Sequence, residues 1–94
     1  MNYQELQGEV LDAAKRCAKR GAGYAQQSAV LEDVAEKYRN HSFTPIDIQT
    51  QQAILTCWHD LFREGYLSWG YDLDNPDAPF FHVPDLPDRP VRQG

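Results

Sequence analysis

The sequence lacks long hydrophobic runs, paired cysteines and recognisable catalytic motifs. No apolar stretch approaches the roughly 20 residues that a membrane-spanning helix needs. The N-terminal stretch MNYQELQGEVLD is polar and acidic, which is not the pattern of a signal peptide. These two absences predict a protein that stays in the cytoplasm and does not bind a membrane.

Cysteine and metal-binding patterns are scarce. Cys17 and Cys57 fall inside expected helices and do not form a Cys-x-x-Cys pair, which predicts buried, reduced thiols of a cytosolic protein. The three histidines lie far apart in the sequence, so zinc is not expected. The segment DLDNPD imitates half of a calcium loop, but counted from Asp72 its fifth, sixth and twelfth positions do not fit that loop. We expect neither a metal nor a cofactor.

Motifs of catalysis are also missing. The sequence has no Gly-rich phosphate loop and no nucleophile elbow. His59 and Asp60 are neighbours on an expected helix, so their side chains do not face each other. A chain of 94 residues has little room for a deep cleft. We therefore expect a protein that is not an enzyme and has no small-molecule substrate.

Two helices are expected in the first 40 residues. Residues 3–20 carry an apolar stripe at helical spacing, with acids in the first half and bases in the second, and Gly21 ends this pattern. Residues 29–39 have a second apolar face, and Ser28 before them is a good N-cap.

The third expected helix begins with a strong start signal and ends near Glu64. Thr44 has the character of an N-cap, Pro45 suits the first helical position, and Asp47 lies where a capping box places an acid. Its apolar face is expected to consist of Ile54, Leu55, Trp58, Leu61 and Phe62. Its outer face is expected to consist of Gln49, Gln52, Thr56, His59, Asp60 and Arg63.

After this helix the pattern changes from helical spacing to alternation. Residues 66–71 alternate, which predicts a strand, and residues 80–83 predict a second short strand. The connection, residues 72–79, is too long for a tight turn, so the two strands form a long-looped hairpin. Residues 84–94 contain three prolines and mixed charges, which predicts a flexible, disordered tail.

Three helices followed by a hairpin is the element order of a winged helix. The string LFREGYLSWGYDLDNPDAPFFHV resembles the passage from third helix to wing in winged-helix domains, including those of uncharacterised prokaryotic proteins. The string contains Leu-x-x-x-Gly-Tyr-Leu at the end of the third helix, and NPDAPFFHV supplies the returning strand of the wing. The resemblance covers roughly residues 28–83, and residues 3–20 fit by order only. The sequence departs from the family because no long basic wing follows the third helix. The resemblance implies an α+β, winged-helix-like domain at residues 1–83 with a tail at 84–94.

The resemblance implies DNA binding as one possible function. A winged helix places its third helix in the major groove, where Gln can read adenine and Arg can read guanine. The DNA-contact candidates are then Gln49, Gln52, Thr56, His59 and Arg63.

The charge distribution disfavours DNA binding by the isolated domain. The third helix holds three acids against Arg63, a formal −2, and residues 65–83 hold three aspartates and no Lys or Arg, a formal −3. Phosphate contacts need donors, and cationic donors drive counterion release. We expect weak DNA binding unless another chain supplies positive charge.

The aromatic residues of the hairpin support a second function, protein binding. They are Tyr66, Trp69, Tyr71, Phe80 and Phe81. Tyr and Trp are enriched at interface anchors, although some of these rings can instead close the hydrophobic core. We favour a protein-interaction module, a subunit, adaptor or regulator of a larger assembly or a homodimer. The alternative is a DNA-binding transcriptional regulator or accessory domain.

Overall fold

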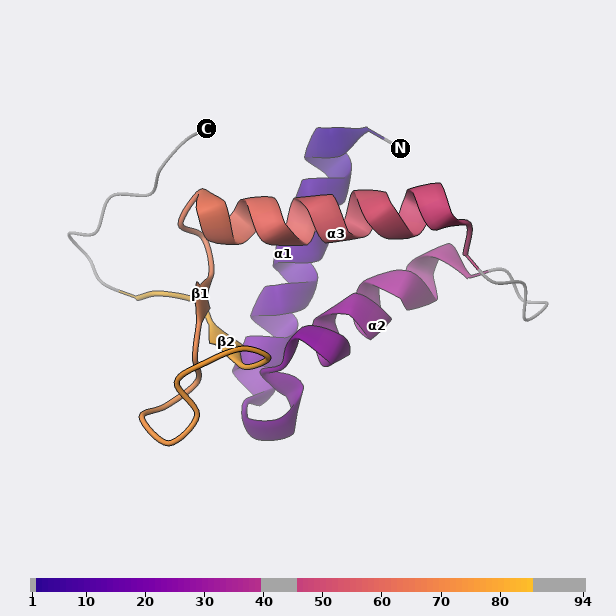
Figure 1. Ribbon diagram of the computed structural model, residues 1–94. Helices are drawn as coiled ribbons and strands as arrows, with labels where there is room; N and C mark the ends of the chain where they lie inside the picture. The colour runs from indigo at the N-terminus through magenta and orange to yellow at the C-terminus, as the bar shows by residue number, and fades with distance from the viewer. Residues whose placement is uncertain (1, 40–45, 86–94) are drawn as a thin grey trace.

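The fold is known from a computed structural model, which describes residues 2–39 and 46–85 (Figure 1). In chain order the elements are α1 (Tyr3–Arg20), the 3-10 turn η1 (Ala22–Tyr24), α2 (Gln27–Tyr38), α3 (Ile48–Arg63), β1 (Ser68–Trp69) and β2 (Phe81–His82). Both α2 and α3 pack against α1 and cross it at steep angles (Figure 1). The predicted α+β order, three helices and then an antiparallel hairpin, is confirmed. The predicted tail lies outside the described residues from 86 onward.

Helix α1 has the predicted bounds. The Asn2 side chain caps its start by accepting a hydrogen bond from the Glu5 backbone N–H at 2.8 Å. Gly21 ends the helix with a φ of 72°, a left-handed conformation that favours glycine. None of the helices in the described part of the chain has both the length and the apolar character that a membrane span needs.

Helix α2 begins earlier than predicted, and Ser28 is not its cap. The N-cap position is Gln26, whose side chain makes no capping bond. A neighbouring segment replaces the side-chain cap, because the Gln27 N–H donates to the Pro79 carbonyl at 2.8 Å. The returning chain of the hairpin thus satisfies a first-turn N–H that a serine would otherwise serve.

Helix α3 begins later than predicted. Thr44 and Pro45 lie outside the described residues, but Ile46 and Asp47 are not helical. Asp47 is the N-cap itself rather than the capping-box acid, since its carboxylate accepts from the Thr50 N–H at 3.1 Å and from the Thr50 hydroxyl at 2.7 Å.

The hairpin strands are shorter than predicted but follow the expected antiparallel pairing. Ser68 lies opposite His82 and Trp69 opposite Phe81. The first strand starts late because the N–H groups of residues 66 and 67 both donate to the Leu61 carbonyl, at 2.9 and 3.2 Å, and thereby cap α3. The returning strand also meets the connection between α1 and α2, through a bridge from Gln26 to Phe80 and a 3.0 Å hydrogen bond from the Phe81 N–H to the Ala25 carbonyl.

Trp58 lies at the centre of the core and has no exposed surface. Its ring makes edge contacts with Phe62, Trp69 and Phe81 at centroid distances of 4.8, 6.0 and 5.3 Å. Its indole N–H donates to the Gln27 side-chain oxygen at 2.9 Å. This single side chain therefore joins α3 to both the hairpin and α2.

Two residues of α3 lie on the opposite side from the predicted one. Leu55, expected in the core, is 40% exposed, and Asp60, expected outside, is 9% exposed. Asp60 is buried because α1 lies against that side of α3, where the Tyr3 hydroxyl donates to its Oδ2 at 2.6 Å and the Arg63 guanidinium pairs with its Oδ1. Leu55 is exposed because it faces the gap between α3 and α2 rather than α1.

Tyrosine–carboxylate hydrogen bonds tie α1 to both other helices. The bond to Asp60 raises the pKa of Tyr3 to about 12. Burial, and then a hydrogen bond donated to Glu9, raises the pKa of Tyr38 to about 12. Glu9 also pairs with Lys37 at 2.8 Å, and these two bonds lower the pKa of Glu9 below its usual value. The folded state thus favours neutral tyrosines and an ionised Glu9.

Replacing Trp58 by Ala is expected to lower the free energy of unfolding by about 3–5 kcal/mol, because it empties the middle of the core and leaves Gln27 without its donor. Urea denaturation followed by circular dichroism measures this loss. Trp69→Ala is the control, because that ring is 36% exposed and its loss is expected to be clearly smaller. Equal losses from the two variants would contradict the anchoring role of Trp58.

Alkaline pH is expected to weaken the fold through the two tyrosines. A folded pKa of about 12, above the ordinary value of 10.0, contributes stability that is complete below pH 10 and lost as the pH rises toward 12. The lowered pKa of Glu9 acts in the other direction. The stability that Glu9 contributes to the fold is present above the ordinary pKa of a glutamate and is lost on acidification. The urea midpoint of the wild type should exceed that of a Tyr3→Phe/Tyr38→Phe double variant at pH 8, and the difference should shrink above pH 10. A difference that stays constant to pH 12 would refute this assignment.

Candidate interaction surface

The five predicted DNA-contact residues share the exposed side of α3. All of Gln49, Gln52, Thr56, His59 and Arg63 are exposed. Part of their hydrogen-bonding capacity is already used, because the Thr56 hydroxyl donates to the Gln52 carbonyl at 2.9 Å and the Arg63 guanidinium pairs with the buried Asp60. The only cation on this helix is therefore neutralised within the fold.

The predicted aromatic surface divides between the core and the exterior. Phe81 has no exposed surface, so the prediction that it belongs to an interaction surface is wrong. Its strand pairs with β1 on one side and contacts Ala25 on the other, which places its ring against Trp58. Tyr66 and Phe80 are half-buried, whereas Trp69 and Tyr71 are exposed.

The exposed Trp69 ring is held in a fixed position. It stacks on Phe62 at a centroid distance of 4.0 Å and an interplanar angle of 18°. Phe62 in turn packs edge-on against Trp58. The outer ring of this series, Trp69, is thus supported by the core and remains partly exposed to solvent.

One carboxylate oxygen organises the loop between β1 and β2. The Oδ1 atom of Asp72 accepts from the Asp74 N–H at 3.1 Å, from the Asn75 N–H at 2.7 Å and from the Asn75 side-chain amide at 2.9 Å. The Tyr71 N–H donates to the Asn75 carbonyl at 2.8 Å. The sequence that imitates a calcium loop thus forms an Asx turn, in which Oδ1 of Asp72 already accepts two backbone hydrogen bonds and one side-chain hydrogen bond from within the loop.

The base of this loop requires glycine. Gly70 has a φ of 101°, and a Cβ atom at this position would lie 2.6 Å from the Pro76 carbonyl oxygen. The Gly70 N–H donates to the Phe80 carbonyl at 2.7 Å, and a 2.6 Å hydrogen bond joins the Gly70 carbonyl to Nδ1 of His82. Because a carbonyl only accepts, this ring nitrogen carries the proton.

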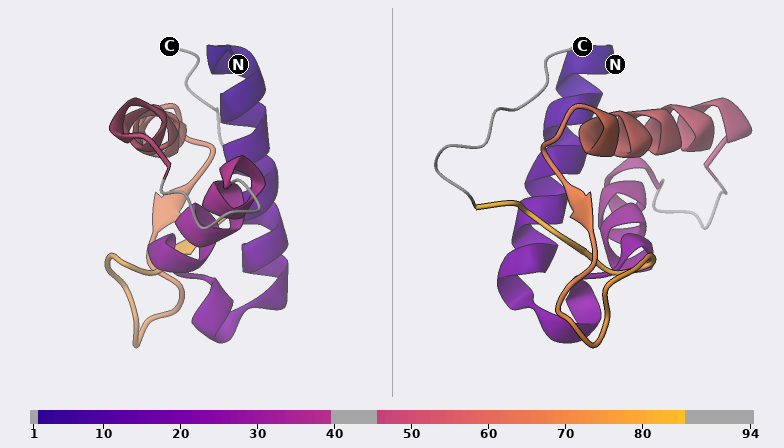
Figure 2. Two further views of the ribbon diagram at one scale, coloured as in Figure 1. Left: turned by 90° about the vertical axis from the view of Figure 1, so that its right-hand side faces the viewer. Right: turned by 60° about the vertical axis from the view of Figure 1, so that its left-hand side comes forward.

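The loop presents a leucine that sequence reasoning missed. Leu73 is 97% exposed, more than any other large hydrophobic residue of the described chain. The loop containing it projects from the end of the domain opposite to the N-terminus in every view (Figures 1 and 2). The segment DLDN contained a sign that Leu73 would be exposed, because an Asx turn that starts at Asp72 places residue 73 at its tip.

The surroundings of these apolar residues are acidic. Between residues 48 and 83 there are five carboxylates and one guanidinium, a formal net charge of −4. Three of the carboxylates, Asp72, Asp74 and Asp77, lie in the exposed loop. In residues 2–39 and 46–85, no three His, Cys, Asp or Glu side chains form a group suited to a metal ion.

No protein-family model, curated protein or solved structure matches this chain. The function must therefore be inferred from the geometry and charge of the chain itself.

Replacing Asp72 by Ala is expected to loosen the loop, because three hydrogen bonds lose their acceptor. Amide hydrogen exchange at residues 74 and 75 should accelerate, while the free energy of unfolding of the whole domain falls by only about 1 kcal/mol. Asp72→Asn keeps an acceptor oxygen and should exchange almost as slowly as the wild type. Equal acceleration in both variants would show that charge rather than hydrogen bonding orders the turn.

Proposed function

We propose that this chain is a non-enzymatic, winged-helix-like module that binds another protein through Trp69, Tyr71 and the hairpin loop. The observation that carries the proposal is Leu73, 97% exposed at the tip of a loop that Asp72 holds in one conformation. An apolar side chain on an ordered turn loses little conformational entropy on binding and gains burial, which favours association.

The charge around the loop specifies the chemistry of the partner. Three loop aspartates surround the apolar tip, and the segment from residue 65 to 83 contains no Lys or Arg. The fitting partner has an apolar pocket for Leu73 with Lys or Arg around its rim. Such complementarity guides encounter and rejects acidic surfaces.

The winged-helix resemblance remains part of this proposal. It is supported by the element order and by the pairing of the returning strand with the α1–α2 connection at Gln26. A cytoplasmic location is also proposed, supported by the two free, buried thiols of Cys17 and Cys57.

DNA binding is the second candidate function. The observation that favours it is the shared exposure of Gln49, Gln52, Thr56, His59 and Arg63 on one side of α3. The acidic loop and the paired Arg63 oppose it, because α3 and residues 65–83 offer no unpaired Lys or Arg to phosphates. This function requires a second chain that supplies positive charge.

Leu73→Ser is expected to weaken binding of the natural partner at least fivefold or so, because it removes an anchor without touching the core. The partner is first identified as a protein that the immobilised wild-type chain retains, and is then purified and titrated with the wild type and the variant. Asp74→Asn/Asp77→Asn should weaken binding in low salt, while Asp12→Asn, an exposed carboxylate on α1, should leave it unchanged. Equal affinity of wild type and Leu73→Ser for every retained protein would overturn the proposal.

A gel-shift series at about 0.15 M salt tests the DNA alternative, with random and genomic duplexes. We expect little binding by the wild type alone. Tight, sequence-selective binding that is lost in Gln52→Ala and Arg63→Ala would establish DNA binding instead.

A further inference from the structure

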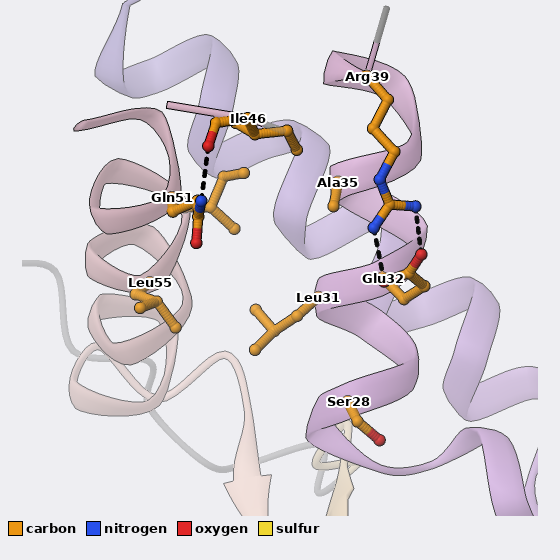
Figure 3. Close-up of a pocket in the computed structure, with 9 residues that line it drawn as sticks. Ser28, Leu31, Glu32, Ala35, Arg39, Ile46, Gln51 and Leu55 are labelled. Carbon is orange, nitrogen blue, oxygen red and sulfur yellow. Dashed lines mark hydrogen bonds and ion pairs between the residues drawn. The ribbon is translucent and has the colours of Figure 1, made fainter. Parts of the chain in front are cut away.

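Two surfaces of the domain expose apolar side chains, and they differ in the charges beside them. One is a groove between α2 and α3, into which Leu55 projects (Figure 3). Its charged lining residues, Glu32 and Arg39, pair with each other, so the groove offers no net charge to a partner. The other is the end of the domain with the hairpin loop, where Leu73 is 97% and Tyr24 is 53% exposed.

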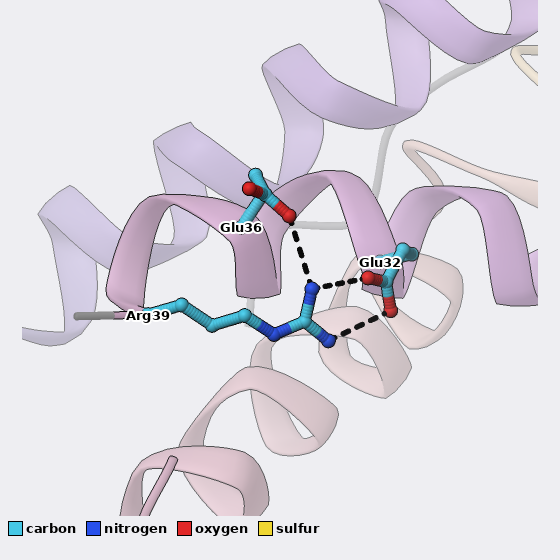
Figure 4. Close-up of polar contacts among 3 residues, drawn as sticks. All are labelled: Glu32, Glu36 and Arg39. Atoms are coloured by element: carbon cyan, nitrogen blue, oxygen red, sulfur yellow. Dashed lines mark hydrogen bonds and ion pairs between the residues drawn. The ribbon is translucent and has the colours of Figure 1, made fainter. Parts of the chain in front are cut away.

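Most of the Lys and Arg residues in the described chain are already bound by carboxylates. Arg39, for example, lies between Glu32 and Glu36 (Figure 4). The other paired cations are Arg16, Lys37 and Arg63. No ion pair with a described residue is made by the remaining three, Lys15, Lys19 and Arg20. These three lie in the last two turns of α1 and are called the basic surface below.

Two carboxylates of the acidic loop, residues 72–79, are unpaired in the same sense. Asp74 and Asp77 are exposed and form no ion pair with a described residue. The opposite charges are also separated along the sequence, since residues 13–31 contain four cations and no acid, and residues 65–83 contain three acids and no cation. The fold thus leaves most of the charge on both segments without a partner.

The basic surface and the acidic loop lie at the same end of the domain. The C-terminal end of α1, η1 and the loop are together in every view (Figures 1 and 2). A Cβ atom added at Gly21, directly after α1, would lie 3.2 Å from the Tyr71 hydroxyl at the start of the loop. The Arg20 guanidinium lies 5.4 Å from the centre of the exposed Tyr24 ring. One end of the domain therefore carries an acidic surface with Leu73 and, beside it, a basic surface with Tyr24.

We propose that this end binds the same end of a second copy of the chain across a two-fold axis, so that the acidic loop of each copy lies on the basic surface of the other. Tyr24 of one copy, bordered by Arg20, is then the apolar contact for Leu73 of the other. This inference rests on the protein binding proposed above for the hairpin and names its partner. Because one end carries both surfaces, each copy uses both of them, and the assembly closes at two copies.

The net charge of the whole chain opposes this contact only weakly. Each copy carries a formal −5, but exposed charges further apart than about 8 Å are largely screened at 0.15 M salt. The charges that meet at the contact therefore decide the sign of the interaction. A nucleic acid fits this end less well, because the acidic loop beside the basic surface repels phosphates.

Sedimentation of the full 94-residue chain tests the dimer directly. The mass should rise with concentration to twice that of one chain and no further, and the dimer should weaken about threefold or more between about 0.05 and 0.5 M salt. A chain that stays monomeric, or a mass that continues to rise beyond two copies, would overturn the proposal.

Charge reversal at each surface identifies the contact. Lys15→Glu/Lys19→Glu and Asp74→Lys/Asp77→Lys should each weaken self-association about tenfold or more, because every reversal acts twice in a two-fold dimer. The second variant has a formal net charge of −1 instead of −5, since each reversal adds two charges, so repulsion between whole chains would predict tighter association for it. Mixing the two variants should restore a dimer, because both contacts then bring opposite charges together. A mixture that stays monomeric would refute the pairing.

The apolar contact is tested with a matched control. Leu73→Ser and Tyr24→Ser should each weaken the dimer about fivefold or more, because each removes an apolar side chain from both symmetry-related contacts. Ile48→Ser removes a side chain that is 63% exposed at the start of α3, away from the loop, and should leave the dimer unchanged. Circular dichroism verifies the fold of each variant. Equal effects of Ile48→Ser and Leu73→Ser would contradict the proposed contact.

Three further results separate this inference from the function on which it rests. A monomeric wild type that retains a different protein through Leu73 would overturn self-association and leave protein binding by the loop intact. If Leu73→Ser changed neither self-association nor the retention of any protein, both proposals would fail. Duplex DNA that binds the wild type at about 0.15 M salt and is released by Lys15→Glu/Lys19→Glu would assign the basic surface to phosphates, which overturns the dimer.

Discussion

The packing of Trp58 is the interaction on which the rest of the structure depends. The ring is fully buried and makes edge contacts with Phe81 of the hairpin and Phe62 of its own helix. Its N–H reaches Gln27, whose backbone N–H is bonded to Pro79 in the returning chain. The hairpin, α2 and α3 are therefore positioned by a connected set of contacts. The orientation of the hairpin surface, which we propose for protein binding, follows from this set.

The hairpin has two parts with different physical roles. Its base is a structural part of the core, because β2 lies between β1 and the α1–α2 connection and carries the buried Phe81. Its tip is solvent-exposed but ordered by the hydrogen bonds to Asp72. A loop that is ordered without being buried can expose an apolar residue such as Leu73 at low entropic cost. This division explains how an aromatic-rich segment supplies both core packing and surface anchors.

The features that local chemistry determines were predictable from the sequence. The bounds of α1 follow from its apolar stripe and Gly21, and the hairpin follows from the change in periodicity. The start of α2 was not predictable in this way, because its first N–H bonds to a residue more than 50 positions away. The same reason applies to Asp60, which is buried only because Tyr3 of α1 reaches it. Helical periodicity defines an apolar face, but residues at its edges depend on which neighbour lies beside them.

The candidate site was only partly predictable for a related reason. Alternation in a strand predicts two faces, but it does not show that a third segment covers one of them, so Phe81 was assigned to the surface. Leu55 has a core-like position on α3, and only the angle between α2 and α3 leaves it in an open groove. The exposure of Leu55 thus arises where tertiary packing ends rather than where the local pattern changes.

Charge placement is the feature that distinguishes the two functional interpretations. The side of α3 that could enter a DNA groove has suitable polar side chains, but its one guanidinium is paired and the adjoining loop adds three carboxylates. The apolar tip of the hairpin loop, bordered by acids, is complementary to a partner surface of apolar residues flanked by Lys and Arg.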